Sequence, residues 1–345
     1  MSSERDTIMQ LPPDLLEAID RVTAKQCNKA NPDSAKKISD RYRNEQRSSH
    51  QSLVHTKDEI AAYVGARMPA TYAAIYSALG YIKMRVPEFS PTSLLDAGAG
   101  PGTAWWAASN IWETLEKAEL VERVTGMIQI GKDLLYQSEE HRQSIKEPLN
   151  KNILWTEADL TSSWVPGSSD LVIAAYVINE LTEKDRQLLI QKLWNATKGV
   201  LLIVEPGTTM GWKRILQARD ELISQGATLI APCPHHRMCP VIEPDWCHFS
   251  ERVNRSRLHR QLKSGELSYE DEKYSYAAFT KLEAGPAKSR IRRHPIFYNG
   301  YIELPLCSDT GLKLVKITRS QKVIYRIAKH SSIGDEWAES SKVAE

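Results

Sequence analysis

"LLDAGAGPGTAWWAA", from Leu94 to Ala108, places three alternate glycines directly after a short apolar run. Gly98, Gly100 and Gly102 stand where a strand would turn into a helix, and residues without a Cβ let a ligand approach the backbone closely. Asp96 and the Pro-Gly pair favour a loop for S-adenosylmethionine over the other candidate ligand, a dinucleotide bound by G-x-G-x-x-G. We expect Asp96 to help order the methionine ammonium group.

From residue 92, short apolar runs alternate with amphipathic segments, which is the pattern of a parallel sheet built from β-α units. The candidate strands are SLLDAG (93–98), RVTGMIQI (123–130), NILWTEADL (152–160), DLVIAAYVI (170–178), GVLLIVEPG (199–207), ATLIAP (227–232) and YSYAAFTKL (274–282). The predicted fold class is therefore α/β, with the Rossmann-like sheet of an S-adenosylmethionine-dependent methyltransferase.

The segments on either side of this sheet follow other patterns. Apolar residues recur at three- and four-residue steps in LLEAIDRVTA (15–24) and in KDEIAAYVGARMPATYAAIYSALGYI (57–82), which predicts helices, the second broken or kinked at Pro69. After Pro286, the runs IFYNGYIELPL (296–306), LKLVKITR (312–319) and KVIYRIAK (322–329) alternate like a small antiparallel β unit. The predicted domains are an N-terminal helical region (1–90), a Rossmann-like methyltransferase domain (91–285) with a cysteine-rich metal-binding insertion near 231–265, a small basic β unit (286–332) and a polar tail (333–345).

Polar residues extend the expected cofactor site along the carboxyl edge of the sheet. Second strands of this fold usually end in an acid that accepts both ribose hydroxyls, and in GMIQI that place is held by Gln129. An amide binds a hydroxyl more weakly than a carboxylate does. After the third strand, Asp159 would meet the adenine amino group and Leu160 would pack on the ring. Asn179 ends the fourth strand at the same edge.

Catalytic residues are harder to assign than cofactor-binding ones. The candidates are Asn179, Glu180 and Glu205, which are polar and follow the fourth and fifth strands, although polar residues there also brace loops. No N-P-P-Y or D-P-P-Y follows the fourth strand, and no cysteine of the sheet domain is placed to attack a pyrimidine. The residues therefore leave open whether a methyl group is transferred or the cofactor is bound without catalysis.

Four cysteines form the candidate metal site. Five residues separate Cys233 from Cys239, seven separate Cys239 from Cys247, and Cys307 lies far downstream. Zinc ribbons have tighter cysteine pairs, whereas proline after Cys233 and Cys239 is typical of cluster-binding runs. A four-thiolate [4Fe-4S] site is the first interpretation.

A structural zinc site with Cys₄ or Cys₃His ligands is the second interpretation, because His235, His236 and His248 lie close to the cysteines in the sequence. Five cysteines in 345 residues are too few for a disulfide-stabilised secreted scaffold, which favours metal over disulfides. Cys27 stands alone in a helical stretch and is expected to be a buried apolar residue.

Charge is strongly segregated although the net charge is only +2. Residues 21–50 hold eight Lys/Arg and three Asp/Glu, residues 93–210 hold ten and sixteen, and residues 251–330 hold seventeen and eight. Basic segments on both sides of an acidic middle predict a polyanionic partner, with RNA the first candidate and solvated helix faces the alternative. SERVNRSRLHRQLK (250–263) and KSRIRRHP (288–295) would form one RNA-facing surface.

No apolar run is long enough to cross a bilayer, and the first residues resemble neither a secretory signal nor a clean transit peptide. We therefore expect no membrane partner and a monomeric protein. The bacterial cytoplasm is the expected compartment, or the mitochondrial matrix if the source is a eukaryote.

Several motifs in one order resemble the methyltransferase-like small-ribosomal-subunit assembly proteins, a family with bacterial and mitochondrial members. They are YVGARMPATYAA (63–74), LLDAGAGPGTAWWAA (94–108), VINEL (177–181), EPGT (205–208), CPHHRMCP (233–240), YEDEKYSY (269–276) and GDEW (334–337). The resemblance covers most of the chain. It implies a Rossmann-like methyltransferase fold that accompanies small-subunit rRNA, with four cysteines binding an iron-sulfur cluster. Two function classes then stay open: an S-adenosylmethionine-dependent rRNA methyltransferase that acts in ribosome assembly, and a non-catalytic RNA-binding assembly factor.

Overall fold

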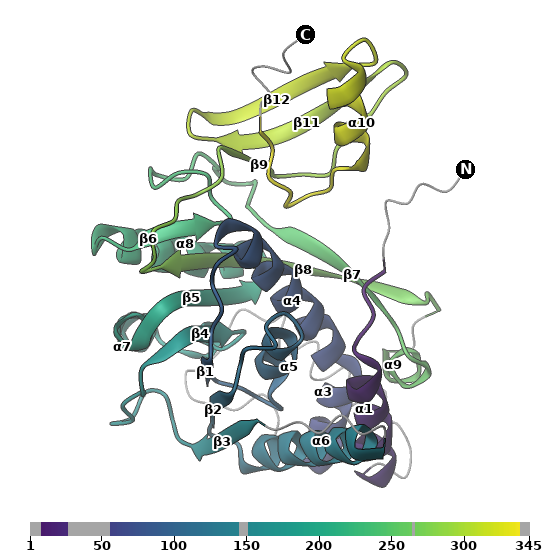
Figure 1. Ribbon diagram of the computed structural model, residues 1–345, viewed down its shortest axis with the longest axis vertical. Helices are drawn as coiled ribbons and strands as arrows, with labels where there is room; N and C mark the ends of the chain where they lie inside the picture. The colour runs from purple at the N-terminus through teal and green to yellow at the C-terminus, as the bar shows by residue number, and fades with distance from the viewer. Residues whose placement is uncertain (1–7, 27–55, 145–150, 264–265, 339–345) are drawn as a thin grey trace.

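The computed structural model describes residues 8–26, 56–144, 151–263 and 266–338. Cys27 and residues 27–50 of the N-terminal basic segment lie outside these ranges, so their expected roles stay predictions. A single large sheet with the strand order β3-β2-β1-β4-β5-β8-β6 forms the centre of the molecule, and β7 also pairs with β8 (Figure 1). The strands are β1 (Ser93–Ala97), β2 (Lys117–Glu122), β3 (Asn152–Glu157), β4 (Ser169–Ala175), β5 (Thr197–Pro206), β6 (Thr228–Ala231), β7 (Phe249–Asn254) and β8 (Tyr269–Thr280).

The sheet confirms the expected α/β Rossmann-like architecture. Strands β1 to β5 pair in parallel, while β8 runs antiparallel to β5, β6 and β7. Strands β1, β4 and β5 read as nearly continuous apolar runs because both faces of a parallel sheet are covered by helices.

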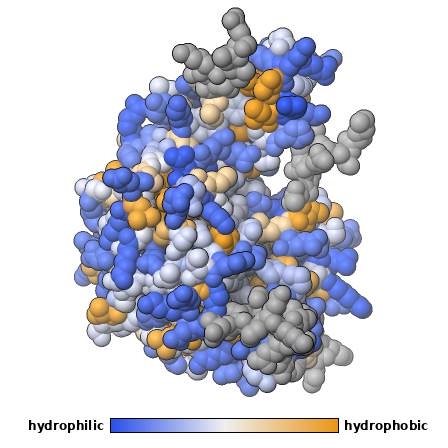
Figure 2. Space-filling view, in the orientation of Figure 1, coloured by the Kyte–Doolittle hydropathy of each residue, from blue (hydrophilic) through white to orange (hydrophobic). Residues whose placement is uncertain are grey.

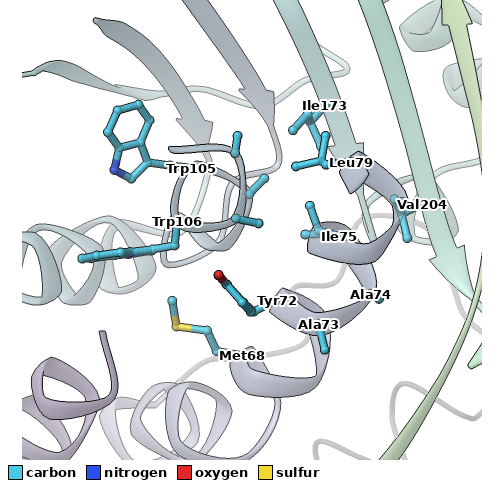
Figure 3. Close-up of a cluster of buried hydrophobic side chains, with 14 of the residues drawn as sticks. Met68, Tyr72, Ala73, Ala74, Ile75, Leu79, Trp105, Trp106, Ile173 and Val204 are labelled. Atoms are coloured by element: carbon cyan, nitrogen blue, oxygen red, sulfur yellow. The ribbon is translucent and has the colours of Figure 1, made fainter. Parts of the chain in front are cut away.

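Helices cover both faces of the sheet. One face carries α4 (Met68–Arg85) and α5 (Thr103–Ser109), whose apolar side chains meet Ile173 of β4 and Val204 of β5 (Figure 3). The other face packs on α7 (Glu183–Ala196) and α8 (Thr209–Ser224). The remaining helices around this layer are α1 (Pro13–Gln26), α3 (Lys57–Ala66), α6 (Thr125–Ser144), α9 (Arg257–Lys263) and the short 3-10 helix η1 (Ile178–Glu180).

The N-terminal helices belong to the same core as the sheet. Thr56 and Glu59 form a capping box at the start of α3, each side chain bonding the other's backbone. The helical stretch is interrupted at Arg67, between α3 and α4, and Pro69 stands in the first turn of α4, where a missing N–H costs little. The predicted break near Pro69 is therefore confirmed.

The second strand of the sheet is not where the sequence analysis placed it. The segment expected as a strand over 123–130 is mostly the first part of α6, in which Met127, Ile130 and Leu134 are buried at helical spacing. The second strand is instead KAELVE, β2, whose glutamates made it look like a polar surface segment. In an edge-proximal parallel strand, only alternate residues need to be apolar.

The C-terminal unit is a four-stranded antiparallel sheet with one helix, and it lies at one end of the molecule (Figure 1). Its elements are β9 (Ser289–Ile291), β10 (Ile296–Phe297), β11 (Tyr301–Ser308), β12 (Gly311–Thr318) and α10 (Lys322–His330). The run KVIYRIAK, expected to continue the β pattern, is helical because Ile324, Tyr325 and Ala328 turn toward the same small core. Ile333 and Trp337, expected in a polar tail, are buried.

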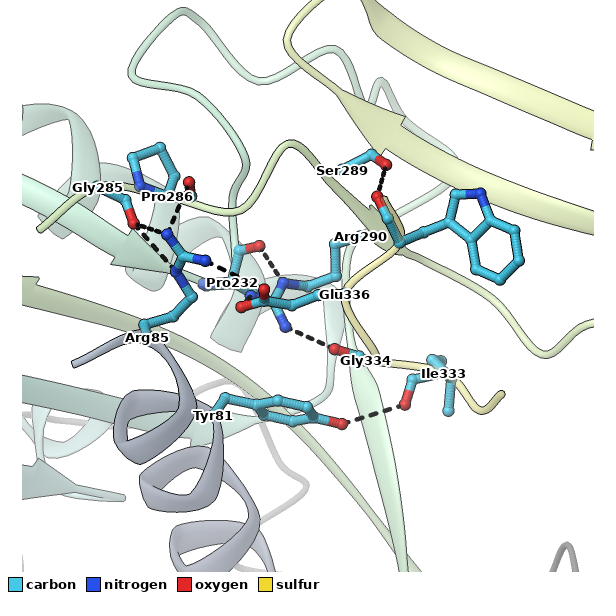
Figure 4. Close-up of polar contacts among 11 residues, drawn as sticks. Tyr81, Arg85, Pro232, Gly285, Pro286, Ser289, Arg290, Ile333, Gly334 and Glu336 are labelled. Carbon is cyan, nitrogen blue, oxygen red and sulfur yellow. Dashed lines mark hydrogen bonds and ion pairs between the residues drawn. The ribbon is translucent and has the colours of Figure 1, made fainter. Parts of the chain in front are cut away.

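Arg290 ties this unit to the main sheet. The side chain is only 2% exposed and donates hydrogen bonds to the backbone carbonyls of Pro232 and Gly334, while the guanidinium lies 5.1 Å from the centre of the Tyr81 ring (Figure 4). Its other nitrogen is 3.4 Å from a carboxylate oxygen of Glu336. One cation thus joins the end of β6, the segment after α10, and α4.

No helix within the described ranges is long and apolar enough to span a membrane. Hydrophilic residues dominate the face seen in Figure 2, with a hydrophobic group over the C-terminal unit near the top.

Arg290→Ala should lower the free energy of unfolding by about 3 kcal/mol, because two buried carbonyls lose their donor and Glu336 loses a partner. Urea denaturation at 25 °C measures this change, and limited proteolysis should show faster cleavage between residues 286 and 338. Arg326→Ala is the matched control: this arginine is exposed on α10, so its loss should change stability by no more than about 0.5 kcal/mol. Equal stability of the two variants would contradict the tethering role.

Candidate functional site

A pocket lies at the carboxyl ends of β1, β2 and β4, the edge at which open α/β sheets bind ligands. Four residues expected to hold a cofactor line it, namely Gly98, Gly100, Asp159 and Leu160. Other side chains complete the pocket wall, and the sequence analysis did not single them out. They include Tyr63, Glu122, Arg123, Val124, Met127 and Tyr176.

The glycine turn leaves open space beside its backbone. Gly98 has a φ of 78°, and a Cβ there would lie 2.4 Å from Cγ2 of Val177. Gly100 has a φ of 55°, but a Cβ on it would meet no protein atom within 4 Å. Because Gly100 lines the pocket, this space is part of the pocket itself. A side chain at position 100 would fill ligand space rather than strike the protein.

Glu122 is the acidic residue at the end of the second strand. Gln129, expected in that place, lies in α6 instead, where its amide donates to Oδ1 of Asp133 at 2.9 Å on the exposed surface. The structure does not bring Gln129 to the pocket wall. The signal for Glu122 was present in the sequence, since KAELVE ends in an acid about 25 residues after Asp96.

The Glu122 carboxylate holds the glycine turn against β2. Its Oε2 accepts a hydrogen bond from the Gly100 amide at 2.9 Å, and its Oε1 accepts from the amides of Arg123 and Val124 at 2.9 Å each. Burial raises the pKa of Glu122, whereas these three amides act in the opposite direction. A carboxylate offers about four acceptor sites, so one on Oε2 is left for a ligand hydroxyl.

Asp96 lies buried beneath the same turn and is 1% exposed. Its Oδ2 has no hydrogen-bond partner among the described residues. Burial, together with the nearby Glu122 carboxylate, raises the pKa of Asp96 to about 8. Gly102 begins α5 just beyond it with a φ of 83°. The pocket therefore has an unsatisfied buried acid behind its glycine turn.

Asp159 and Leu160 follow β3, as the sequence predicts. Oδ1 of Asp159 accepts hydrogen bonds from the Thr161 amide at 2.8 Å and from the Thr161 hydroxyl at 2.7 Å. Leu160 is buried and lines the pocket beside it. An acid fixed by its own turn next to an apolar side chain suits a planar base with an exocyclic amino group.

Only one of the three catalytic candidates lines the pocket, although the Asn179 amide and the Glu180 carboxylate both lie close enough to Glu205 to influence its pKa. Glu180 lines the pocket and forms an ion pair with Arg123 at 3.0 Å. Asn179 and Glu205 lie outside the pocket wall, and Oδ1 of Asn179 and both carboxylate oxygens of Glu205 lack a good hydrogen bond within the described part of the chain. Burial raises the pKa of Glu205 to about 8, although Arg214, with its guanidinium at 3.7 Å, acts in the opposite direction.

Tyr176 closes the pocket from the end of β4 in a left-handed conformation, with a φ of 58° that is rare for a residue other than glycine. Its hydroxyl donates to Oε1 of Glu272 at 2.9 Å. Arg67 binds both oxygens of the same carboxylate, at 2.8 and 2.7 Å, and lies 5.1 Å from the centre of the Tyr176 ring. This buried network fixes the tyrosine, and sequence reasoning missed all three residues.

The four late cysteines surround a second pocket. Cys233, Cys239, Cys247 and Cys307 are all unpaired and line one mostly apolar hollow between α8, β8 and the C-terminal unit. Burial raises the pKa of all four thiols, that of Cys307 to about 12, and each of the other three cysteines adds to the rise at Cys247. Nε2 of His235 lies 3.8 Å from Sγ of Cys307.

The cysteine pocket contains no preformed metal-ligand group among its described residues. Within the described ranges, no three His, Cys, Asp or Glu side chains are grouped to hold one metal ion. What the structure shows is that all four cysteines line the same pocket.

Arginines hold the backbone of the cysteine loop. Arg219 of α8 is 2% exposed and donates to the carbonyls of His235 and Arg237. Arg292 and Arg293 pair with Asp245, and Arg293 also donates to the carbonyl of Trp246. With Arg290 on Pro232, cations anchor both ends of the loop.

This arrangement corrects the expected RNA face. The basic run KSRIRRHP was predicted to lie on the surface, yet its three arginines are engaged in the protein: Arg290 is buried, and Arg292 and Arg293 pair with an aspartate. In the other expected basic run, Arg252 pairs with Asp271 and Arg255 with Glu270, whereas Arg257 and Arg260 of α9 are exposed. A count of charges along the chain could not reveal these partners.

The chain matches a family model across residues 57–338, and that family is described as "Mitochondrial small ribosomal subunit Rsm22". It is similar to the human "Ribosome assembly protein METTL17, mitochondrial", with 29% identity, 83% of this chain and 64% of the human protein covered. It is similar to "Rsm22-cox11 tandem protein 2, mitochondrial" of Schizosaccharomyces pombe, with 26% identity and coverage of 81% and 43%. The chain thus spans less than two thirds of either relative.

Solved structures with a related fold include a putative RNA methyltransferase from Pyrococcus horikoshii, with a TM-score of 0.39, 13% identity, and coverage of 63% of this chain and 87% of that one. An O-methyltransferase family protein from Burkholderia thailandensis has a TM-score of 0.42, 12% identity, and coverage of 76% and 71%. Scores this low add nothing to the strand order described above. The family match covers most of the chain, and we conclude that the chain belongs to the Rsm22 family.

Proposed function

We propose that this chain binds S-adenosylmethionine in the pocket beside Gly100 and acts in assembly of the small ribosomal subunit. The observation that carries the cofactor assignment is the open space at Gly100 beside the Glu122 carboxylate. A backbone cradle next to a fixed acid is what a nucleoside with two ribose hydroxyls requires.

Each part of the cofactor would find a partner in the pocket or directly behind its glycine turn. The remaining acceptor site of Glu122 would take a ribose hydroxyl, while Asp159 and Leu160 would hold the adenine ring. Asp96, buried without a partner for Oδ2, would gain one from the cationic methionine end, which favours its charged form. When bound, S-adenosylmethionine supplies an electrophilic methyl group.

The arrangement of polar groups favours an assembly factor over a methyltransferase. Glu180 is engaged by Arg123, and neither Asn179 nor Glu205 reaches the pocket wall. A general base must lie within hydrogen-bond reach of the proton it removes. In our proposal the role of the bound cofactor is therefore to stabilise the carboxyl edge of the central sheet.

The partner and the compartment follow from the family. The human relative is named a mitochondrial ribosome assembly protein and the family is described by the mitochondrial small ribosomal subunit, which supports that subunit and its rRNA as partner. The same names favour the mitochondrial matrix over the bacterial cytoplasm. The chain spans only part of the length of its relatives. The partner and the compartment are therefore proposals for this chain.

The four cysteines are proposed to hold a [4Fe-4S] cluster. All four line one mostly apolar pocket, and proline after Cys233 and Cys239 is typical of cluster-binding runs. Arg219, Arg290 and Arg292 also line it and would offset the negative charge of four thiolates. When bound, a cluster supplies a rigid link between the loop and β11.

Gly100→Ala should weaken binding of S-adenosylmethionine at least about tenfold, because the new methyl group occupies ligand space. Isothermal calorimetry with S-adenosylmethionine and S-adenosylhomocysteine measures this loss. Gly226→Ala is the matched control: it has a φ of 85° and open space around its Cβ, but it lies outside the pocket wall.

Both alanine variants should lose about 1 kcal/mol of stability, since an L-residue is strained at positive φ. If both bind the cofactor as the wild type does, the pocket is not the cofactor site. If both variants lose binding equally, backbone strain explains the loss, and the inference that the cofactor occupies the open space beside Gly100 is wrong.

Anaerobically purified protein should contain about four irons per chain and absorb visible light. Cys239→Ser should remove most of the iron, whereas Cys27→Ser should leave the iron content unchanged. Metal analysis by mass spectrometry together with the visible spectrum decides the point. One zinc per chain with no visible absorbance would establish the zinc alternative instead.

A further inference from the structure

One face of the C-terminal sheet is left uncovered by α10. In the β11–β12 ladder, Ile302, Leu304 and Leu306 point to the core that α10 helps to close. The alternate residues point the other way, so that Tyr301 and Thr318, Glu303 and Lys316, and Pro305 and Leu314 pair on the opposite face. We call this opposite surface, from Tyr298 and Tyr301 to Leu314, the outer face.

Two tyrosines and a lysine form a stack on the outer face. The rings of Tyr298 and Tyr301 lie nearly parallel, 15° apart with centroids separated by 4.6 Å. Nζ of Lys316 lies 4.0 Å from the centroid of Tyr301. Since β10 and β12 flank β11 on opposite sides, Lys316 and Tyr298 approach Tyr301 from opposite sides. Tyr298 ends the stack and is 44% exposed.

The outer face is held in place by its own turn. The Tyr298 amide donates to the Tyr301 carbonyl at 3.0 Å, and the Arg319 amide donates to the Gly300 carbonyl at 3.0 Å. The Tyr298 hydroxyl bonds Glu303, the acid on this face, and Lys316 stands directly opposite Glu303 in the ladder. An ordered aromatic ring that needs no rearrangement loses little entropy when a base stacks on it.

The positive charge around the outer face indicates which kind of partner it binds. Residues 311–330 hold six Lys/Arg and no Asp/Glu. All six cations are exposed, with Lys316 and Arg319 next to the tyrosines and three others on α10. Arg290, Arg292 and Arg293, first expected to meet RNA, are engaged inside the protein, whereas this segment is a basic surface that stays exposed within the described ranges. A polyanion whose units carry flat rings satisfies both the cations and the stack.

We propose that the outer face binds a single-stranded segment of RNA by stacking one base on Tyr298, with Lys316 and Arg319 contacting its phosphates. This rests on the proposed function, which supplies small-subunit RNA as the partner. A duplex would keep its bases stacked inside the helix, so an unpaired strand is the form that fits.

Fluorescence anisotropy of the full chain with a labelled, unstructured RNA of twelve nucleotides tests this surface. Tyr298→Ala should raise the Kd roughly 5- to 150-fold, the range for losing one stacked base. Tyr298→Phe should stay within about twofold of the wild type, because stacking needs the ring and not the hydroxyl. Lys316→Gln should flatten the salt dependence by about 0.7 in slope, one phosphate contact, whereas Tyr298→Ala should leave the slope unchanged.

Tyr269→Ala is the matched control, because Tyr269 also lies under a cation, with Arg252 4.1 Å from its ring centroid, but on β8. It should bind RNA as the wild type does. If Tyr298→Ala matches the wild type while the wild type binds RNA, the outer face is wrong and the RNA partner stands. If the wild type binds isolated small subunits but not this RNA, the partner of the outer face is a protein and the proposal is overturned.

Discussion

The pocket beside Gly100 depends on one carboxylate. Glu122 accepts hydrogen bonds from three backbone amides, including that of Gly100, so it fixes the end of β2 against the glycine turn after β1. Charge-assisted bonds of this kind offset the cost of burying the acid. The sheet makes the contact possible, because Ala97 and Val121 are register partners and the next residues on each strand reach the same edge.

The two pockets share that edge of the sheet. The strand order runs from β1 through β4, β5 and β8 to β6, and the cysteine loop begins just after β6. Three strand spacings separate β4 from β6, or about 15 Å. Glu205, buried at the end of β5, lies between the two sites. A cofactor at one end and a cluster at the other would therefore stabilise neighbouring parts of one surface.

Strands that are buried on both faces can be predicted from the sequence, because nearly all their residues are apolar. Elements that are buried on one side only, by contacts with their neighbours in the fold, are missed or assigned wrongly. Runs such as DLVIAAYVI need no context, and the prediction for them is confirmed as β4. KAELVE carries too few apolar residues to stand out, and KVIYRIAK has a β-like alternation that its helical core contacts override. Asp159 and Leu160 were placed correctly because they directly follow a strand, whereas the place of Gln129 depended on a strand that is a helix.

The arginines show a second limit of sequence reasoning. A basic run was interpreted as a solvent-facing surface, yet Arg290 reaches a carbonyl 58 positions away in the sequence. Such partners come from the tertiary fold, and charge counts contain no trace of them. The same fold leaves the acid-free segment after Asp309 exposed. A basic C-terminal surface therefore exists, but it lies at another place than the sequence analysis predicted.

The most direct test compares Glu122 with Gln129, because each has been considered as the residue that binds the ribose hydroxyls of the cofactor. Calorimetry with S-adenosylmethionine should show affinity reduced about 10- to 100-fold in Glu122→Gln, because the new amide nitrogen cannot accept hydrogen bonds from the turn or from a ribose hydroxyl. Gln129→Ala should bind the cofactor as tightly as the wild type. Normal binding by Glu122→Gln, with loss in Gln129→Ala, would contradict the pocket described here.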